Sequence, residues 1–133
     1  MNPNSYTAPL EELSSFLMEL KHILTSETYE LDILPKKKEE DPLDPFTTEN
    51  TMLDLDYDKE DVRNQLLSLT EKDYIETIID DKDSSRPPFW VFGKFISSRE
   101  VYIKVKIRNK ITNKIFCVSF HYARHPSKSG PYI

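Results

Sequence analysis

Two segments near the C-terminal end of the chain, residues 101–109 and 114–122, alternate apolar and polar side chains. Such alternation places the apolar side chains on one face of a strand and the polar side chains on the other. The four residues between the segments, 110–113, are few enough for a hairpin turn. The two segments therefore predict an antiparallel hairpin with one face in a core and the other exposed.

A turn over residues 110–113 also predicts the register of this hairpin. It pairs Val105 with Val118, Ile103 with Phe120, Lys104 with Ser119 and Tyr102 with His121. A slip by one residue would set polar side chains against apolar ones, so we expect this pairing. The polar face then gathers Tyr102, Lys104, Lys106, Arg108, Cys117, Ser119 and His121, and the apolar face of the second strand gathers Phe116, Val118, Phe120 and Tyr122.

The N-terminal part of the chain predicts helices. Apolar residues recur at three- and four-residue steps from Leu10 to Leu24, which indicates an amphipathic helix with Thr7 as its N-cap. Residues 53–79 predict two further helices. Asp58 would cap the first, and a Thr70–Asp73 capping box would begin the second.

The remaining segments complete a single α+β domain over residues 1–133. They predict a flexible leader at 1–8, a short extended piece at 28–34, an acidic proline-rich loop at 35–50, a polar loop at 80–88 and a strand at 89–96. We expect the N-terminal helices to pack on one face of a small antiparallel sheet within residues 89–122. The other face of that sheet would carry the functional site.

Charge is distributed unevenly along the chain. Residues 1–85 hold 22 acidic and 8 basic residues, whereas residues 86–133 hold 10 basic residues and one acidic residue. A segment as basic as the second is typical of a protein that binds a polyanion such as nucleic acid. The alternative is that the acidic part neutralises the basic part across an internal interface.

Composition excludes several classes of protein. The single cysteine, Cys117, excludes an internal disulfide and a multi-cysteine zinc site, and two glycines are too few for a glycine-rich phosphate loop. Asp80, Asp81 and Asp83 do not have the spacing of a cation-binding loop. No apolar run reaches the ~20 residues of a membrane span, and the N-terminus lacks a secretory pattern. We therefore expect a cytoplasmic protein with no cofactor, no metal and no membrane partner.

The polar face of the hairpin carries side chains suited to phosphate chemistry. His121 can move a proton near neutral pH, and Tyr102 opposite it can act as its partner. Lys104 and Lys106 can stabilise charge that develops on phosphate oxygens. We predict these four as catalytic residues, and we predict that Lys94, Arg108, Arg86 and Ser119 bind RNA. The alternative is an ordinary solvated sheet face.

The same segments resemble a known family. WVFGK (90–94), VYIKVKIR (101–108), VSFHYARHP (118–126), LTEKDY (69–74) and the Pro131–Tyr132 ending are similar to the Gram-positive-like branch of MqsR-type toxins. The resemblance covers roughly residues 14–133. It implies a RelE-like fold and a metal-independent endoribonuclease that cleaves mRNA, the toxin of a type II toxin–antitoxin system. It also implies a cognate antitoxin of the helix-turn-helix type.

The chain departs from the best-studied branch of that family at three functional positions. Glu76, Val91 and His121 stand where that branch has Lys, Gln and Lys, whereas Tyr102 is kept. These departures leave an alternative open, a non-catalytic RNA- or protein-binding module on the same fold, in effect a decayed toxin. In a third hypothesis, residues 1–85 cover the basic face and keep the protein latent.

Overall fold

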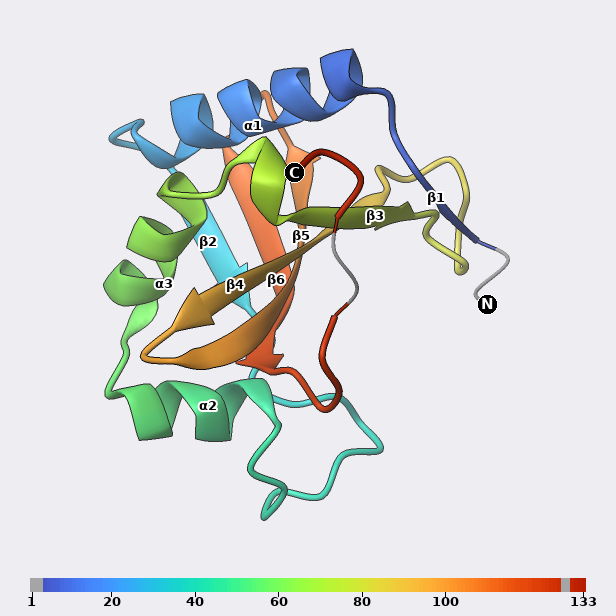
Figure 1. Cartoon of the computed structure of the whole chain (residues 1–133). Coiled ribbons are helices and arrows are strands. Elements are labelled where there is room, and N and C mark those ends of the chain that lie inside the picture. Colours follow the sequence, from blue (N-terminus) through green and yellow to red (C-terminus); the bar gives the residue numbers. More distant parts are fainter. Residues whose placement is uncertain (1–3, 128–129) are drawn as a thin grey trace.

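Three α-helices and one six-stranded sheet form the α+β fold of this computed structural model, which describes residues 4–127 and 130–133 (Figure 1). The elements are β1 (Ser5–Tyr6), α1 (Leu10–Leu24), β2 (Glu30–Ile33), α2 (Thr48–Leu55), α3 (Lys59–Leu67), a 3-10 turn (Glu71–Asp73), β3 (Tyr74–Ile78), β4 (Phe89–Ile96), β5 (Arg99–Asn109) and β6 (Lys114–Tyr122). The strand order is β1-β3-β4-β5-β6-β2. The expectation of a wholly antiparallel sheet is wrong, because β2 returns from α1 and pairs parallel to β6.

Helix α1 has the predicted bounds and covers one face of the sheet. Its apolar stripe is buried and consists of Leu13, Phe16, Leu17, Leu20, Ile23 and Leu24. The Phe16 ring stacks on Trp90 of β4 with 4.5 Å between ring centroids. Thr7 is not the N-cap, because the helix begins directly after Pro9, whose carbonyl accepts the hydrogen bond from Leu13.

Residues 58–78 contain one predicted helix that is confirmed and one that is wrong. Helix α3 begins after Asp58, whose side chain forms a capping box with Asp61, as predicted. The Thr70–Asp73 capping box also forms, but it is followed by β3 rather than by a helix. β-branched residues are common in residues 74–78, and pairing with strands on both sides outweighs the local helix signal.

Helix α2 covers an edge of the sheet and was not predicted at this position. It begins at Thr48, so the 35–50 loop ends at residue 47. The Thr48 hydroxyl accepts a hydrogen bond from the Phe120 amide, and the Thr51 hydroxyl accepts one from the Tyr122 amide, each at 3.0 Å. The helix thereby satisfies the amides of β6 beyond the end of its pairing with β2.

Both ends of the chain run along the sheet. The 1–8 leader was expected to be flexible, but residues 5 and 6 form β1 and the buried Ala8 amide donates to the Tyr74 hydroxyl at 2.9 Å; residues 1–3 lie outside the described part. The described part of the C-terminal tail lacks regular structure. It ends with the Tyr132 hydroxyl donating to the Ala8 carbonyl at 2.6 Å. Gly130 is required there, because a Cβ atom would lie 2.0 Å from the Tyr74 carbonyl oxygen.

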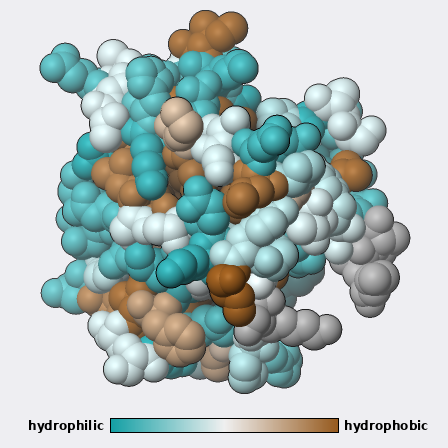
Figure 2. Space-filling model, turned by 45° about the horizontal axis from the view of Figure 1, so that its top comes forward, coloured by the Kyte–Doolittle hydropathy of each residue, from teal (hydrophilic) through white to brown (hydrophobic). Residues whose placement is uncertain are grey.

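The surface is mostly polar. Figure 2 shows one face on which hydrophilic side chains predominate and hydrophobic ones form small separate groups. Among the described residues, none of the helices has the length and apolar character needed to cross a membrane. Scattered apolar groups of this kind are normal on a protein surface.

Candidate active site

A β-bulge in β6 determines which side chains share the face opposite α1, which we call the outer face. The predicted pairs of Tyr102 with His121, Ile103 with Phe120 and Lys104 with Ser119 are confirmed. Beyond them the register shifts, and Val105 pairs with Cys117 instead of Val118. Val118 is therefore the extra residue of the bulge, and the alternation of β6 reverses before it.

The reversal corrects three assignments on β6. Val118 was expected on the apolar face but lines a pocket on the outer face. Cys117 was expected on the polar face but lies fully buried in the core, where burial raises the pKa of its thiol to about 12. A buried, protonated thiol is a poor nucleophile. Phe116 was expected on the apolar face but lies on the outer face, against Phe89 of β4.

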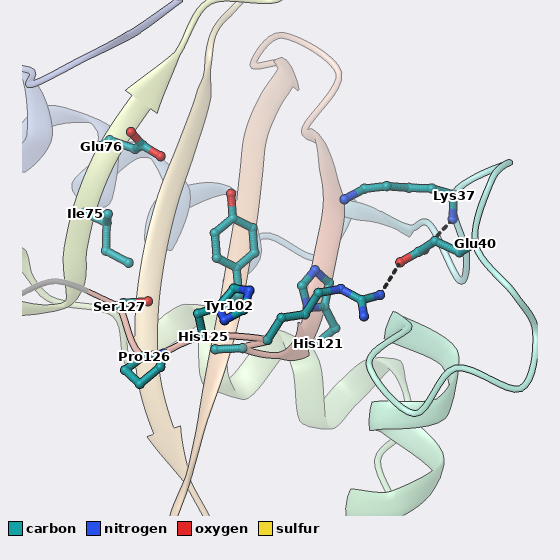
Figure 3. Close-up of a pocket in the computed structure, with 11 residues that line it drawn as sticks. Lys37, Glu40, Ile75, Glu76, Tyr102, His121, His125, Pro126 and Ser127 are labelled. Atoms are coloured by element: carbon teal, nitrogen blue, oxygen red, sulfur yellow. Dashed lines mark hydrogen bonds and ion pairs between the residues drawn. The ribbon is translucent and has the colours of Figure 1, made fainter. Parts of the chain in front are cut away.

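Tyr102 and His121 lie side by side on the outer face. Their rings stack with 5.3 Å between centroids and 18° between planes. They line a pocket of about 510 Å³ (Figure 3). The other lining residues are Lys37, Glu40, Ile75, Glu76, Ala123, Arg124, His125, Pro126 and Ser127. Figure 3 shows Tyr102 between Glu76 of β3 and Lys37 of the 35–47 loop.

The imidazole of His121 is oriented by the backbone beside it. Its Nδ1 lies 2.9 Å from the Tyr122 carbonyl oxygen, so in the neutral ring Nδ1 carries the proton and donates it. Nε2 then carries a lone pair. Burial lowers the pKa of His121 below its usual 6.5, so the ring is neutral at pH 7. His121 is therefore able to accept a proton at Nε2.

The Tyr102 phenol has the opposite property. Burial, assisted by the Glu76 carboxylate, raises the pKa of Tyr102 to about 12. The phenol therefore keeps its proton at neutral pH and serves as a hydrogen-bond donor. The two stacked rings place a proton acceptor beside a proton donor, which is the pairing that acid–base catalysis requires.

Three cations lie near these rings. Lys104, predicted from the sequence, follows Tyr102 on the same face and is partly buried, which lowers the pKa of its ammonium. Lys37 and Arg124 also line the pocket and were not predicted. The sequence offered a signal for Arg124, which lies two residues after the end of β6, but Lys37 comes from a distant loop.

The 35–47 loop forms one wall of the pocket and supplies carboxylates to it. Arg124 Nη2 lies 2.6 Å from Asp44 and 3.5 Å from Glu40. Glu40 also accepts a hydrogen bond from the Lys37 amide at 2.8 Å, which closes a turn within the loop. The acidic loop therefore neutralises a cation of the pocket in part.

Two predicted site residues are not available to a substrate. Lys106 is buried, with Nζ 2.9 Å from Asp80 and 3.1 Å from the Pro87 carbonyl. The Ser119 side chain is also fully buried, and its hydroxyl has no hydrogen-bond partner within the described part of the chain. The sequence pattern placed both on the correct face but did not show that both are buried.

The remaining predicted RNA-binding residues lie in two other places. Lys94 pairs with the core residue Val101 and bonds the Ser68 hydroxyl at the end of α3, so it belongs to the opposite face. Arg86 and Arg108 are exposed and line a second pocket further along the outer face. The structure therefore brings Tyr102 and His121 together and places the other predicted residues around or away from them.

The chain matches no model of a known protein family, and no curated protein matches it. Within residues 4–127 and 130–133, no group of three or more His, Cys, Asp or Glu side chains is placed to hold a metal ion.

Proposed function

We propose that the chain is a metal-independent endoribonuclease of the MqsR type, within the RelE-like superfamily, which cuts single-stranded mRNA through the ribose 2′-hydroxyl. The observation that carries this proposal is the stack of the His121 and Tyr102 rings, with 5.3 Å between centroids and with His121 Nδ1 donating to the Tyr122 carbonyl. The lowered pKa of His121 and the raised pKa of Tyr102 support it. The resemblance of residues 90–94, 101–108 and 118–126 to MqsR-type toxins supports it.

The proposed reaction uses both rings. His121 Nε2 takes the proton of the 2′-hydroxyl, and the 2′-oxygen attacks the adjacent phosphorus. The bond from phosphorus to the 5′-oxygen breaks, and the leaving 5′-oxygen takes a proton from the Tyr102 hydroxyl. The products are a 2′,3′-cyclic phosphate and a 5′-hydroxyl, and proton exchange with water restores both side chains. Lys104, Lys37 and Arg124 stabilise the charge that develops on the phosphate oxygens.

The three departures from the best-studied branch lie close to this site. Two of the departures, Glu76 and Val91, pair with each other, and Val91 also pairs with Lys104. Glu76, Val91 and Lys104 therefore form one row across the sheet. The row carries an acid at Glu76 where the branch has a lysine. In our proposal Lys37, which reaches the pocket from the 35–47 loop, supplies the missing cation.

The purified full chain, incubated with a single-stranded RNA oligonucleotide, tests the proposal. We expect cleavage that is unchanged by excess chelator and that leaves a 2′,3′-cyclic phosphate. His121→Ala should slow it by a factor of about 100 or more, the range of acid–base catalysis. His22→Ala, an exposed histidine on α1, is the matched control and should cut as fast as the wild type. Cleavage that stops with chelator, or that persists in His121→Ala, contradicts the proposal.

The proposed role as a toxin is tested in cells. Induction of the chain alone should arrest growth, and induction of His121→Ala should not. Co-expression of the adjacent reading frame, which we expect to encode a helix-turn-helix antitoxin, should restore growth. Arrest of equal strength by the His121→Ala variant would separate toxicity from the proposed chemistry.

A second candidate is a binding module without activity on the same fold. Two observations favour it: Lys106 is held by Asp80, and Arg124 is held by Asp44 and Glu40. Fewer cations are then available to stabilise the negative charge of a transition state than the sequence predicts. RNA that stays intact but binds with an affinity that falls steeply with salt would select this candidate.

A further inference from the structure

A second pocket lies on the outer face, beyond the Tyr102–His121 site. It has a volume of about 680 Å³ and lies between the 80–88 loop and the strands β5 and β6. Its floor is formed by Phe89 and Phe116, whose rings meet edge to face with 6.5 Å between centroids. The proposed reaction uses none of its lining residues.

Cations surround the two rings of this pocket. The Arg108 guanidinium lies 4.1 Å from the Phe116 ring centroid, and Lys106 and Lys104 lie 4.1 Å and 4.8 Å from that of Phe89. Aromatic rings beside cationic side chains are the usual means of holding unpaired bases, which stack on a ring or on a guanidinium plane.

Contacts within the protein hold the walls of this pocket in place. The bulge at Val118 turns Phe116 toward the outer face instead of into the core. The buried Lys106–Asp80 ion pair fixes the 80–88 loop against β5, so the wall beside Phe89 is held in place. A preformed site binds with a smaller loss of conformational entropy.

We propose that this pocket binds an unpaired base of the RNA, one or more nucleotides away from the bond that is cut. The inference rests on the proposed function. Arg108 and Arg86 hold the phosphates that flank the base. Their present partners, Asp32 at 3.6 Å and Asp83 at 3.7 Å, form long and exposed ion pairs that a phosphate can replace.

The arrangement of β5 connects the two sites. Tyr102, Lys104 and Lys106 occupy every second position of β5 and so lie on the same face of the strand. Lys106, which lines the second pocket, is four residues from Tyr102, or about 13 Å at ~3.3 Å per residue. Lys104 lies between the two and contacts the Phe89 ring. An RNA strand along β5 would pass from the stacked rings over Lys104 to the Phe89–Phe116 floor.

Base stacking, rather than charge, supplies most of the expected affinity of the pocket. Asp80 compensates Lys106 within it, and the exposed Asp81 lies at its rim. Stacking of one base on a ring strengthens binding by roughly 5- to 150-fold, which corresponds to about 1–3 kcal/mol. The ring of Phe116 is therefore the group to remove in a test.

The test compares RNA oligonucleotides of two lengths that carry 2′-O-methyl groups and so are not cut. Phe116→Leu removes the ring and keeps an apolar side chain. It should weaken binding of a hexanucleotide by about tenfold and leave binding of a dinucleotide, which fills only the first site, unchanged. Phe95→Leu is the matched control, because Phe95 is an exposed aromatic outside both pockets. With cleavable RNA, Phe116→Leu should raise KM and leave kcat unchanged.

The possible results test base binding in the second pocket separately from the proposed cleavage. Equal hexanucleotide binding by Phe116→Leu and the wild type overturns the base site, and RNA cleavage by the wild type would then still support the nuclease. Binding that depends on Phe116 without cleavage supports the base site and contradicts the nuclease. If Phe116→Leu unfolds, Arg108→Gln, at an exposed side chain, replaces it and should weaken hexanucleotide binding alone. A preference for peptides over RNA would also overturn the inference.

Discussion

Lys106 and Asp80 form an ion pair with 2.9 Å between Nζ and Oδ2, and both side chains are buried. The pair joins the 80–88 loop to the middle of β5. The Lys106 hydrogen bond lowers the pKa of Asp80 below its usual 3.8 despite the opposing effect of burial. Lys106, predicted to contact a phosphate, is therefore part of the framework that supports the outer face.

Asp80→Asn should destabilise the fold by on the order of 3 kcal/mol, because it leaves the buried Lys106 ammonium without a counter-charge. The free energy of unfolding in denaturant measures this. The double variant Asp80→Asn with Lys106→Met removes both charges and should recover most of the loss. Because the pKa of Asp80 is lowered in the fold, the stabilisation is present above pH 3.8 and is lost as the pH falls through the folded pKa. Asp80→Asn should lack this loss.

Cleavage should depend on pH through His121. The ring acts as a base only when neutral, and burial lowers its pKa below 6.5. We therefore expect kcat/KM to be level near pH 7 and to fall only below pH 6.5. A rate profile measured over roughly pH 4.5 to 8, which brackets the ordinary pKa of histidine, checks this. An acid limb with its midpoint above 6.5 would contradict the role of a buried base.

Tyr102→Phe isolates the phenol hydroxyl, because it keeps the ring that stacks on His121. It should slow single-turnover cleavage by about 100-fold and leave the KM for RNA near the wild-type value. Tyr29→Phe, at a residue whose hydroxyl bonds Glu60 away from the site, serves as the control. If Tyr102→Phe cuts as fast as the wild type, the leaving oxygen takes its proton elsewhere.

Removal of the carboxylates on Arg124 should increase RNA affinity. Asp44→Asn with Glu40→Gln frees the guanidinium for a phosphate, and we expect roughly two- to fivefold tighter binding. The salt dependence of binding should become steeper, because one more cation contacts the RNA. Glu49→Gln, on α2, is the control and should leave both unchanged. Unchanged RNA affinity in the double variant would contradict the hypothesis that the acidic part, residues 1–85, keeps the site latent.

Thr51→Val should destabilise the fold by about 1–3 kcal/mol, because it leaves the buried Tyr122 amide without an acceptor. Thr48→Val should act similarly through the Phe120 amide. Thr112→Val, at an exposed turn residue, should change the unfolding midpoint little. Hydrogen exchange of the two β6 amides gives a local readout, and exchange as slow as in the wild type would contradict these roles.

Much of the fold follows from local sequence signals. The stripe from Leu13 to Leu24 predicts α1, the Asp58 cap predicts the start of α3, and the alternation predicts β5 and β6. The pairing of Tyr102 with His121 also follows from the short turn between those strands. These features depend on residues close in sequence, where periodicity and capping are informative.

The rest depends on contacts between distant segments. Residues before and after the bulge at Val118 alternate equally well, so only packing against the core selects the side for Cys117. The burial of Lys106 requires the 80–88 loop to fold back on β5. The contribution of Lys37 requires the 35–47 loop to lie over β6, which no local pattern indicates.

The outermost strands of the described sheet, β1 and β2, have two and four residues. An edge this short offers few free backbone groups, and α2 occupies the rest of β6. At the β1 and β2 edges, a protein partner therefore has little opportunity to extend the sheet by adding a strand of its own. We therefore expect a protein that inhibits the proposed reaction to cover the stacked rings of Tyr102 and His121 directly.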